Sequence, residues 1–177
     1  MNISWSAWGT PIELISKQLE EIFYEKPIIL CLGSDKVLED CLGPLCGTML
    51  SKLGYQGFVY GTLEAPIFCQ NVECAFNFVK AVHPNRKILV IDASTTKDSD
   101  RLGKIVLAKN YQPFNLNLKN VNLKADWFLF GVCSTNQGLS LAGSRMAIVQ
   151  KIADTICSAI IKTQNACLFE NRTAQFV

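Results

Sequence analysis

Apolar residues recur every three to four positions in four segments of the chain, and this spacing is typical of amphipathic helices. The expected helices cover about residues 11–25, 43–53, 71–81 and 139–161. The first begins with a capping box, and proline occupies the first turn of both the first and the second. Asn71 is the expected N-cap of the third. The pattern therefore predicts four helices that each bury one face.

Short apolar runs without alternation separate these helices, as expected for parallel strands covered on both faces. The clearest runs are residues 27–33 and 87–92, and further strands are expected at 58–60, 105–107 and 127–132. Alternating β and α elements predict an α/β fold, a three-layer α/β/α sandwich with a mostly parallel sheet.

No repeat or linker interrupts this succession of elements. Residues 1–177 are therefore expected to form a single domain, with a core from about residue 10 to 162. The segment 163–177 lacks clear periodicity and is expected to be a C-terminal tail, and the Asn-rich segment 110–122 is expected to be a loop.

Composition and charge argue against two classes of binding partner, nucleic acids and membranes. Hydrophobic residues make up 49% of the chain and charged residues 18%, which favours a folded domain over a disordered one. A net charge of +2 is too small for binding to a phosphate backbone, so no nucleic acid partner is expected. The longest uncharged stretch, 127–144, is interrupted by polar residues at 134–137, so no membrane partner is expected either.

The first residues show neither a basic segment nor an apolar one, which predicts a protein without a secretory signal in the reducing cytoplasm. The eight cysteines are then expected to be thiols. The pairs Cys41/Cys46 and Cys69/Cys74 raise the alternative of a zinc site. They lie in apolar periodic segments, however, where cysteine packs as a small hydrophobic residue, and the prediction is that no metal is bound there.

Ligands of open parallel sheets bind beyond the carboxyl ends of the strands. The loops that follow strands here are 34–42, 93–102 and 133–138. They bring acidic and amide side chains to one edge, with Asp92 expected at the tip of its strand. The candidate site residues from these loops and from that tip are Ser34, Asp35, Glu39, Asp40, Asp92 and Asn136.

The single histidine limits the chemistry that this edge can perform. His83 lies in the turn before the 87–92 strand, which places it at the opposite, amino end of the sheet, where a structural role is expected. Without a histidine at the carboxyl edge, Ser-His-Asp and Cys-His arrangements lack their base, and a histidine-rich metal site cannot form.

A carboxylate pair remains, and Asp40 and Asp92 are its best candidates. Asp40 lies about one turn ahead of a helix N-terminus, which favours its charged form. Asp92 follows an apolar strand, where desolvation favours its protonated form. Such a pair can activate a water molecule and protonate a leaving amine. Two alternatives stay open: the same oxygens, with Glu39 or Asn136, could hold a divalent cation, or the two aspartates could simply cap a helix and start a turn.

Three further features have weaker functional interpretations. Residues 34–36 could form a phosphate-contacting turn, which the acidity of the loop opposes. Cys41 could be a nucleophile of lowered pKa, which the adjacent carboxylate opposes. Arg145, early in the last helix, could reach a site acid or lie on the surface.

The motif residues also resemble a known family. Gly33-Ser34-Asp35, followed by Asp40-Cys41-Leu42-Gly43-Pro44, resembles the signature of YyaC-type sporulation proteins, which are classed as spore proteases. The segments 61–66, 83–85 and 91–93 continue the resemblance in the same order, and it covers roughly residues 27–160. That family is similar to the spore germination protease and to the hydrogenase maturation endopeptidases, with a phosphorylase/hydrolase-like α/β fold.

The resemblance implies that Asp40 and Asp92 are the two active-site acids. The hydrogenase endopeptidases use an additional histidine to recognise nickel, whereas the corresponding segment 131–138 contains Asn136 and no histidine, so the two-acid germination protease is the closer comparison. The leading hypothesis is a sporulation-associated endopeptidase acting on a protein or peptide substrate. Asp40 would activate the water and Asp92 would carry the shared proton, or the two roles would be reversed. Ser34, Asp35 and Asn136 would line the cleft.

Two competing hypotheses keep the same fold. The protein could be a non-catalytic sporulation protein that binds a peptide or a metal ion in the acidic cleft. A hydrolase of small molecules that uses the same acids is the third hypothesis. No cofactor is expected for the peptidase, although a divalent cation at Asp40 and Asp92 is compatible with it.

Overall fold

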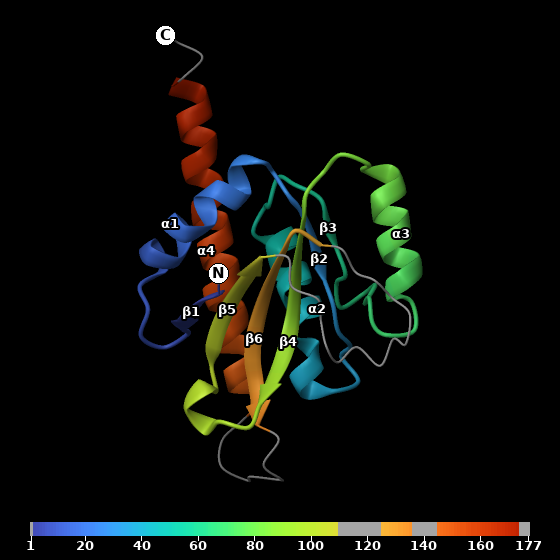
Figure 1. Ribbon diagram of the computed structural model, residues 1–177, viewed down its shortest axis with the longest axis vertical. Coiled ribbons are helices and arrows are strands. Elements are labelled where there is room, and N and C mark those ends of the chain that lie inside the picture. The colour runs from blue at the N-terminus through green and yellow to red at the C-terminus, as the bar shows by residue number, and fades with distance from the viewer. Residues whose placement is uncertain (1, 110–124, 136–144, 174–177) are drawn as a thin grey trace.

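A six-stranded mixed sheet forms the centre of the protein in the computed structural model, which describes residues 2–109, 125–135 and 145–173 (Figure 1). The strand order is β1-β5-β6-β4-β2-β3, in which β2, β3, β4 and β6 run parallel and β5 is antiparallel to both of its neighbours. The α/β fold with a mostly parallel sheet is thus confirmed. The strands are β1 (Asn2–Ser6), β2 (Ile28–Cys31), β3 (Val59–Tyr60), β4 (Ile88–Thr96), β5 (Lys104–Lys109) and β6 (Trp127–Thr135).

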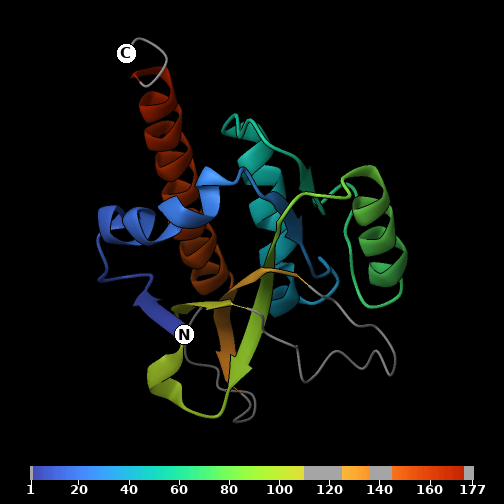
Figure 2. The same cartoon turned by 45° about the horizontal axis from the view of Figure 1, so that its top comes forward.

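Helices cover both faces of the sheet, and they are distributed unequally. Helices α1 (Ile12–Tyr24), α2 (Leu42–Lys52) and α4 (Arg145–Thr173) pack with alternate strand residues in one core cluster. Helix α3 (Val72–Val82) packs in a second cluster on the opposite face and stands apart from the other three helices in Figure 2. Successive side chains of β4 point to opposite faces of the sheet. Leu89 and Ile91 therefore belong to the first cluster, whereas Ile88 and Val90 belong to the second.

The C-terminal segment differs from the expectation of a tail beginning at residue 163. Helix α4 continues to Thr173, and Thr163 and Cys167 are buried. The Thr163 hydroxyl contacts both the carbonyl and the hydroxyl of Ser16 on α1, at 3.1 Å and 3.0 Å. Because this contact buries polar side chains, the apolar period that would reveal a helix is interrupted there.

The N-terminal strand was not expected, and a core starting at about residue 10 is wrong at this end. Strand β1 pairs with β5 along its whole length, and Trp5 and Ala7 are buried. Ile3 and Trp5 alternate with serine, and this alternation is the sequence signal for the strand. A strand of five residues at a sheet edge gives only a weak pattern.

Strands β4 and β6 extend further than the apolar runs indicated. Both end in small and polar residues, up to Thr96 and Thr135, which hid their continuation. Asp92 therefore lies inside β4, not at its tip. The expected loop at 110–122 and the start of the last helix at 139 lie outside the described residues. Within the residues that are described, no helix is both long enough and apolar enough to span a bilayer.

Candidate active site

Asp92 reaches solvent because the neighbouring strand ends beside it. Strand β2 pairs with β4 from Ile28↔Ile88 to Cys31↔Ile91 and then stops, so Asp92 is the first residue of β4 beyond this pairing. On the other side it pairs with Phe130 of β6. Its carboxylate oxygen Oδ1 accepts a hydrogen bond of 2.8 Å from the Ala93 N–H. Asp92 is thus half-buried, on the face of the sheet that α3 covers.

Asp40 lies in a single 3₁₀ turn, Leu38–Cys41, that joins the segment after β2 to helix α2. The turn folds back on the end of β2, because the Ser34 N–H donates to the Asp40 carbonyl at 3.2 Å. The Asp40 N–H in turn donates to the Val37 carbonyl at 3.0 Å. Backbone hydrogen bonds therefore hold Asp40 next to the carboxyl end of the sheet.

Two glycines make this arrangement sterically feasible. Gly33 has φ +132°, and a Cβ atom there would lie 1.9 Å from the Asp40 carbonyl oxygen. A Cβ atom on Gly43 would lie 1.9 Å from the Leu32 carbonyl oxygen. Side chains cannot be accommodated at such distances without displacing backbone. Both motif glycines thus allow the turn carrying Asp40, and α2 after it, to pack directly on β2.

Asp40 and Asp92 line the same pocket, which has a volume of about 310 Å³. Its other wall is the segment 67–70 between β3 and α3. This segment is tied to β2 by a hydrogen bond of 2.8 Å from the Gly33 N–H to the Ile67 carbonyl. The remaining lining is mostly apolar, and the complete set is Leu32, Gly33, Ser34, Lys36, Val37, Asp40, Ile67, Phe68, Cys69, Gln70, Val72 and Asp92.

Of the expected cleft residues, the structure places Ser34 in the pocket together with the two acids. Asp35 is exposed and does not line it. The Lys36 N–H donates to the Ser34 hydroxyl oxygen at 3.2 Å, which forms a local turn that leaves the Asp35 side chain in solvent. Asn136 and the side chain of Arg145 lie outside the described residues.

The wall at residues 67–70 and Lys36 were not expected as parts of the pocket. Phe68 and Lys36 also contact each other, with the Lys36 Nζ 6.0 Å from the ring centre. The rule that ligands bind in loops between strand and helix applies equally to the segment after β3. This segment joins the predicted 58–60 strand to the predicted helix from Asn71, so its place beside the pocket follows from the same rule.

Burial raises the pKa of Asp92 to about 7. The hydrogen bond from Ala93 lowers this pKa somewhat, and the negative charge of Asp40 raises it. Burial also raises the pKa of Asp40, against the effect of the Ser34 backbone. The expectation that the helix N-terminus favours the charged form of Asp40 is therefore wrong in direction, since desolvation outweighs it. With a pKa of about 7, Asp92 is about half protonated near neutral pH.

The cysteines and His83 take no part in this pair. The pKa of Cys41 is raised by burial and by the charges of Asp35 and Asp40, which disfavours a thiolate nucleophile. All eight cysteines are free thiols. His83 lies at the amino end of the sheet, as expected, with Nε2 2.8 Å from the Tyr60 hydroxyl.

A metal ion would find few ligands in the part of the chain that the structure describes. Among residues 2–109, 125–135 and 145–173, no three His, Cys, Asp or Glu side chains are grouped so as to hold one. Asp40 and Asp92 could provide carboxylate oxygens to a divalent cation, which prefers six or more oxygen ligands when it is calcium. Protonation of Asp92 would compete with such binding.

The raised pKa of Asp92 predicts a dependence of stability on pH. An aspartate in the unfolded chain titrates near pH 4, so between about pH 4 and pH 7 the folded state binds more protons than the unfolded state. The free energy of unfolding is therefore expected to fall as the pH rises through this window, by at most about 4 kcal/mol from this group.

Urea unfolding between pH 4 and 8 measures this effect, and Asp92→Asn is the matched control because it removes the titrating group. The wild-type protein should lose more stability than the variant as the pH rises from 4 to 7. Curves that run parallel for the two proteins would contradict the assignment.

The chain is similar to known proteins in sequence and in fold. Residues 6–159 match the family described as "Protein of unknown function (DUF1256)". The chain is 31% identical over 81 residues to "Uncharacterized protein YyaC" of Bacillus subtilis (strain 168), a match that covers 45% of this chain and only 40% of that protein. The crystal structure of the [NiFe] hydrogenase maturation protease HycI from Thermococcus kodakarensis KOD1 superposes with a TM-score of 0.56 at 13% identity, covering 84% of this chain and 99% of the other. The latter likeness is one of fold alone.

Proposed function

Because the chain belongs to the DUF1256 family and has the fold of a hydrogenase maturation protease, we propose that it is a peptidase whose catalytic pair is Asp40 and Asp92. The observation that carries this proposal is the shared pocket, which both aspartates line and in which Asp92 has a pKa of about 7. A group with a pKa near the working pH can both hold and release a proton, which is what general acid–base catalysis requires.

In the proposed reaction one aspartate is the general base and the other is the general acid. Ionised Asp40 takes a proton from a water molecule as its oxygen attacks the carbonyl carbon of the scissile peptide bond. Protonated Asp92 donates its proton to the leaving nitrogen as the carbon–nitrogen bond breaks. The reaction leaves Asp40 protonated and Asp92 ionised, and transfer of the proton back restores the pair. If Asp92 activates the water and Asp40 donates the proton, the protons are conserved in the same way, as is usual for coupled carboxyl groups.

The pocket walls support a protein or peptide as substrate. Val37, Ile67 and Phe68 offer apolar surface beside the two acids, and Lys36 adds a positive charge at the wall. Apolar walls exclude water and so strengthen the electrostatic interactions of the acids with a bound amide. A peptide segment with an apolar side chain next to the scissile bond fits these features.

The biological setting in the proposal is sporulation in the cytoplasm. The motif resemblance to sporulation proteins supports this setting. The match spans less than half of YyaC, so the substrate is proposed from the pocket rather than from that protein.

The proposal is tested by incubating the purified protein with spore extract and identifying new peptide termini by mass spectrometry. Wild type should generate termini that Asp40→Asn and Asp92→Asn do not, and equal processing by all three proteins would remove the proposal. A rise in melting temperature with calcium or manganese that is lost in Asp40→Asn, without turnover of any peptide, would favour the non-catalytic binding protein instead.

A further inference from the structure

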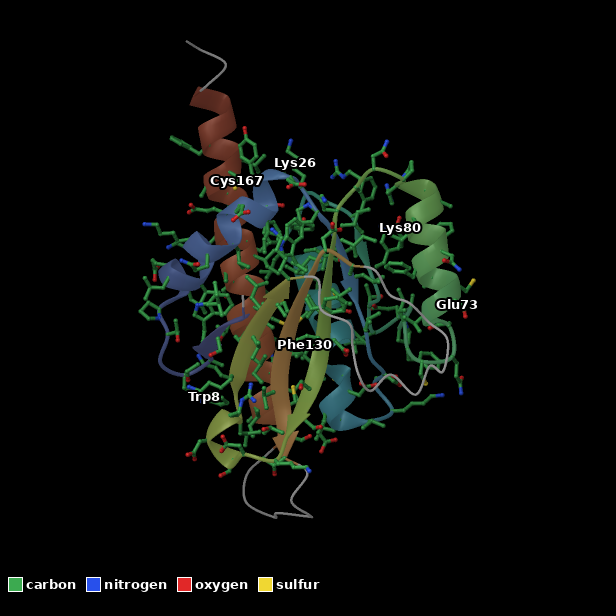
Figure 3. The ribbon with its side chains drawn as sticks, in the orientation of Figure 1. Trp8, Lys26, Glu73, Lys80, Phe130 and Cys167 are labelled. Carbon is green, nitrogen blue, oxygen red and sulfur yellow. The ribbon has the colours of Figure 1, made fainter. Side chains whose placement is uncertain are left out.

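A second pocket lies at the amino end of the sheet, away from Asp40 and Asp92. It has a volume of about 130 Å³. Lys26 and Arg86, which line it, stand just before the first residues of β2 and β4, whereas Asp92 lies in the later half of β4. Lys26 and Cys167, both lining residues, are labelled at this end of the molecule in Figure 3. The pocket is therefore separate from the candidate active site.

The polar side chains of this pocket present hydrogen-bond donors and no carboxylate. Arg86 donates from Nη2 to the Lys26 carbonyl at 2.6 Å, while its Nε is buried without a hydrogen-bond partner among the described residues. Gln164 is only 9% exposed and uses its Oε1 to accept from the Gln56 N–H at 2.7 Å, which leaves its amide nitrogen as a donor. The Tyr55 hydroxyl donates to the Pro27 carbonyl at 3.1 Å, and burial raises the pKa of Tyr55 to about 12, so this side chain adds no negative charge at neutral pH. Such a set of donors is suited to an anion.

The conformation of Lys26 adds an independent indication. Lys26 follows helix α1 with φ +50°, in the left-handed region where glycine is favoured after a helix. A lysine at this position costs stability relative to glycine, and this cost fits a position at which the side chain is used. Lys26 lines the pocket, and its backbone carbonyl accepts the hydrogen bond from the Arg86 guanidinium, so the two residues form one part of the pocket wall.

Aromatic side chains make up the apolar part of the pocket. Phe23, Tyr55 and Phe58 line it, and the rings of Phe23 and Tyr55 meet edge to face with centres 6.1 Å apart. A dry cavity of about 150 Å³ accommodates one benzene ring, so the volume here suits a ring-sized apolar group.

We propose that this pocket binds a small carboxylate attached to a single ring-sized apolar group, with the carboxylate at Arg86 and Lys26 and the ring among Phe23, Tyr55 and Phe58. The guanidinium fork matches a carboxylate in two parallel hydrogen bonds, and the lysine adds a second positive charge. A free aromatic acid and the C-terminal residue of a peptide share this chemistry.

Isothermal titration calorimetry with 3-phenylpropionate tests the proposal. Wild type should bind it, and should bind the uncharged 3-phenylpropionamide at least about tenfold more weakly, because a hydrogen bond to a charged group is lost. Propionate and inorganic phosphate, which lack the ring, should bind at least about tenfold more weakly as well.

The variants Arg86→Gln and Lys26→Gly should each weaken binding by about tenfold. Lys26→Gly should also raise the melting temperature, so its loss of binding cannot be attributed to unfolding. Lys17 is an exposed lysine of helix α1 that does not line the pocket, so Lys17→Gln should bind as wild type does.

Each outcome decides the proposal. No binding of 3-phenylpropionate to wild type, equal binding to all variants, or binding of phosphate as tight as that of the aromatic acid would overturn it. Comparison with Ala-Ala-Ala-Phe bearing a free carboxyl end separates the two sources, since tighter binding of the peptide assigns a chain end and tighter binding of the free acid assigns a small molecule.

Discussion

Replacing Asp92 by asparagine is expected to slow peptide hydrolysis by about a hundredfold to ten-thousandfold, the range typical of a lost general acid or base. Asparagine has nearly the same shape but can neither release nor accept the proton that the leaving nitrogen needs. Asp40→Asn should have an effect of the same order, because the two groups act as one unit. Initial rates on a peptide identified from the extract measure the loss.

Asp35→Asn is the matched control for this experiment. Asp35 belongs to the same loop as Asp40 and carries the same charge, but it is exposed and does not line the pocket. Its rate should stay within about twofold of wild type, since screening by water weakens its influence. A large loss in Asp35→Asn, or an unchanged rate in Asp92→Asn, would show that the catalytic pair has been assigned to the wrong residues.

Gly33→Ala is expected to destabilise the protein by about 2 to 4 kcal/mol and to abolish activity in the molecules that remain folded. The added Cβ would meet the Asp40 carbonyl oxygen at 1.9 Å in a backbone conformation with φ +132°. Relief of this overlap requires the 3₁₀ turn to move, and Asp40 would move with it. Urea unfolding and initial rates measure the two effects.

Gly54→Ala is the control that distinguishes the steric overlap at Gly33 from the energetic cost of placing alanine in a left-handed backbone conformation. Gly54 also has a positive φ, +77°, but nothing lies within 4 Å of the Cβ that alanine would add. It should lose only about 1 kcal/mol and keep its activity. Similar losses of stability in the two variants would mean that the contact between Gly33 and Asp40 does not hold the site together.

The sequence pattern predicted secondary structure correctly where an element buries one face or both faces. The buried strand at 27–33 and the first residues of the strand from 87 contain only apolar residues at paired positions, so their β structure and parallel pairing could be predicted. The position of Asp40 shortly before a helix could be predicted as well, because Pro44 marks the first turn of α2.

The sequence pattern did not predict structure where polar residues are buried. It also did not predict the exposure or the pKa of a side chain where these depend on segments that are distant in sequence. Thr163 and Gln164 hide the last turns of α4 because tertiary hydrogen bonds replace apolar contacts there. The position of Asp92 within β4 depends on where β2 ends, a property of another strand. The raised pKa of Asp40 depends on burial by segments distant along the chain, which a helix N-terminus in isolation does not reveal.

The coupling of Asp40 with Asp92 in one pocket can be measured directly by following the carboxyl carbon of Asp92 by NMR between pH 3 and 9. In the wild-type protein this resonance should titrate with a midpoint near 7, and the midpoint should fall in Asp40→Asn, because the neighbouring negative charge is removed while burial remains. A midpoint near the ordinary value of about 4, or the same midpoint in both proteins, would contradict the account.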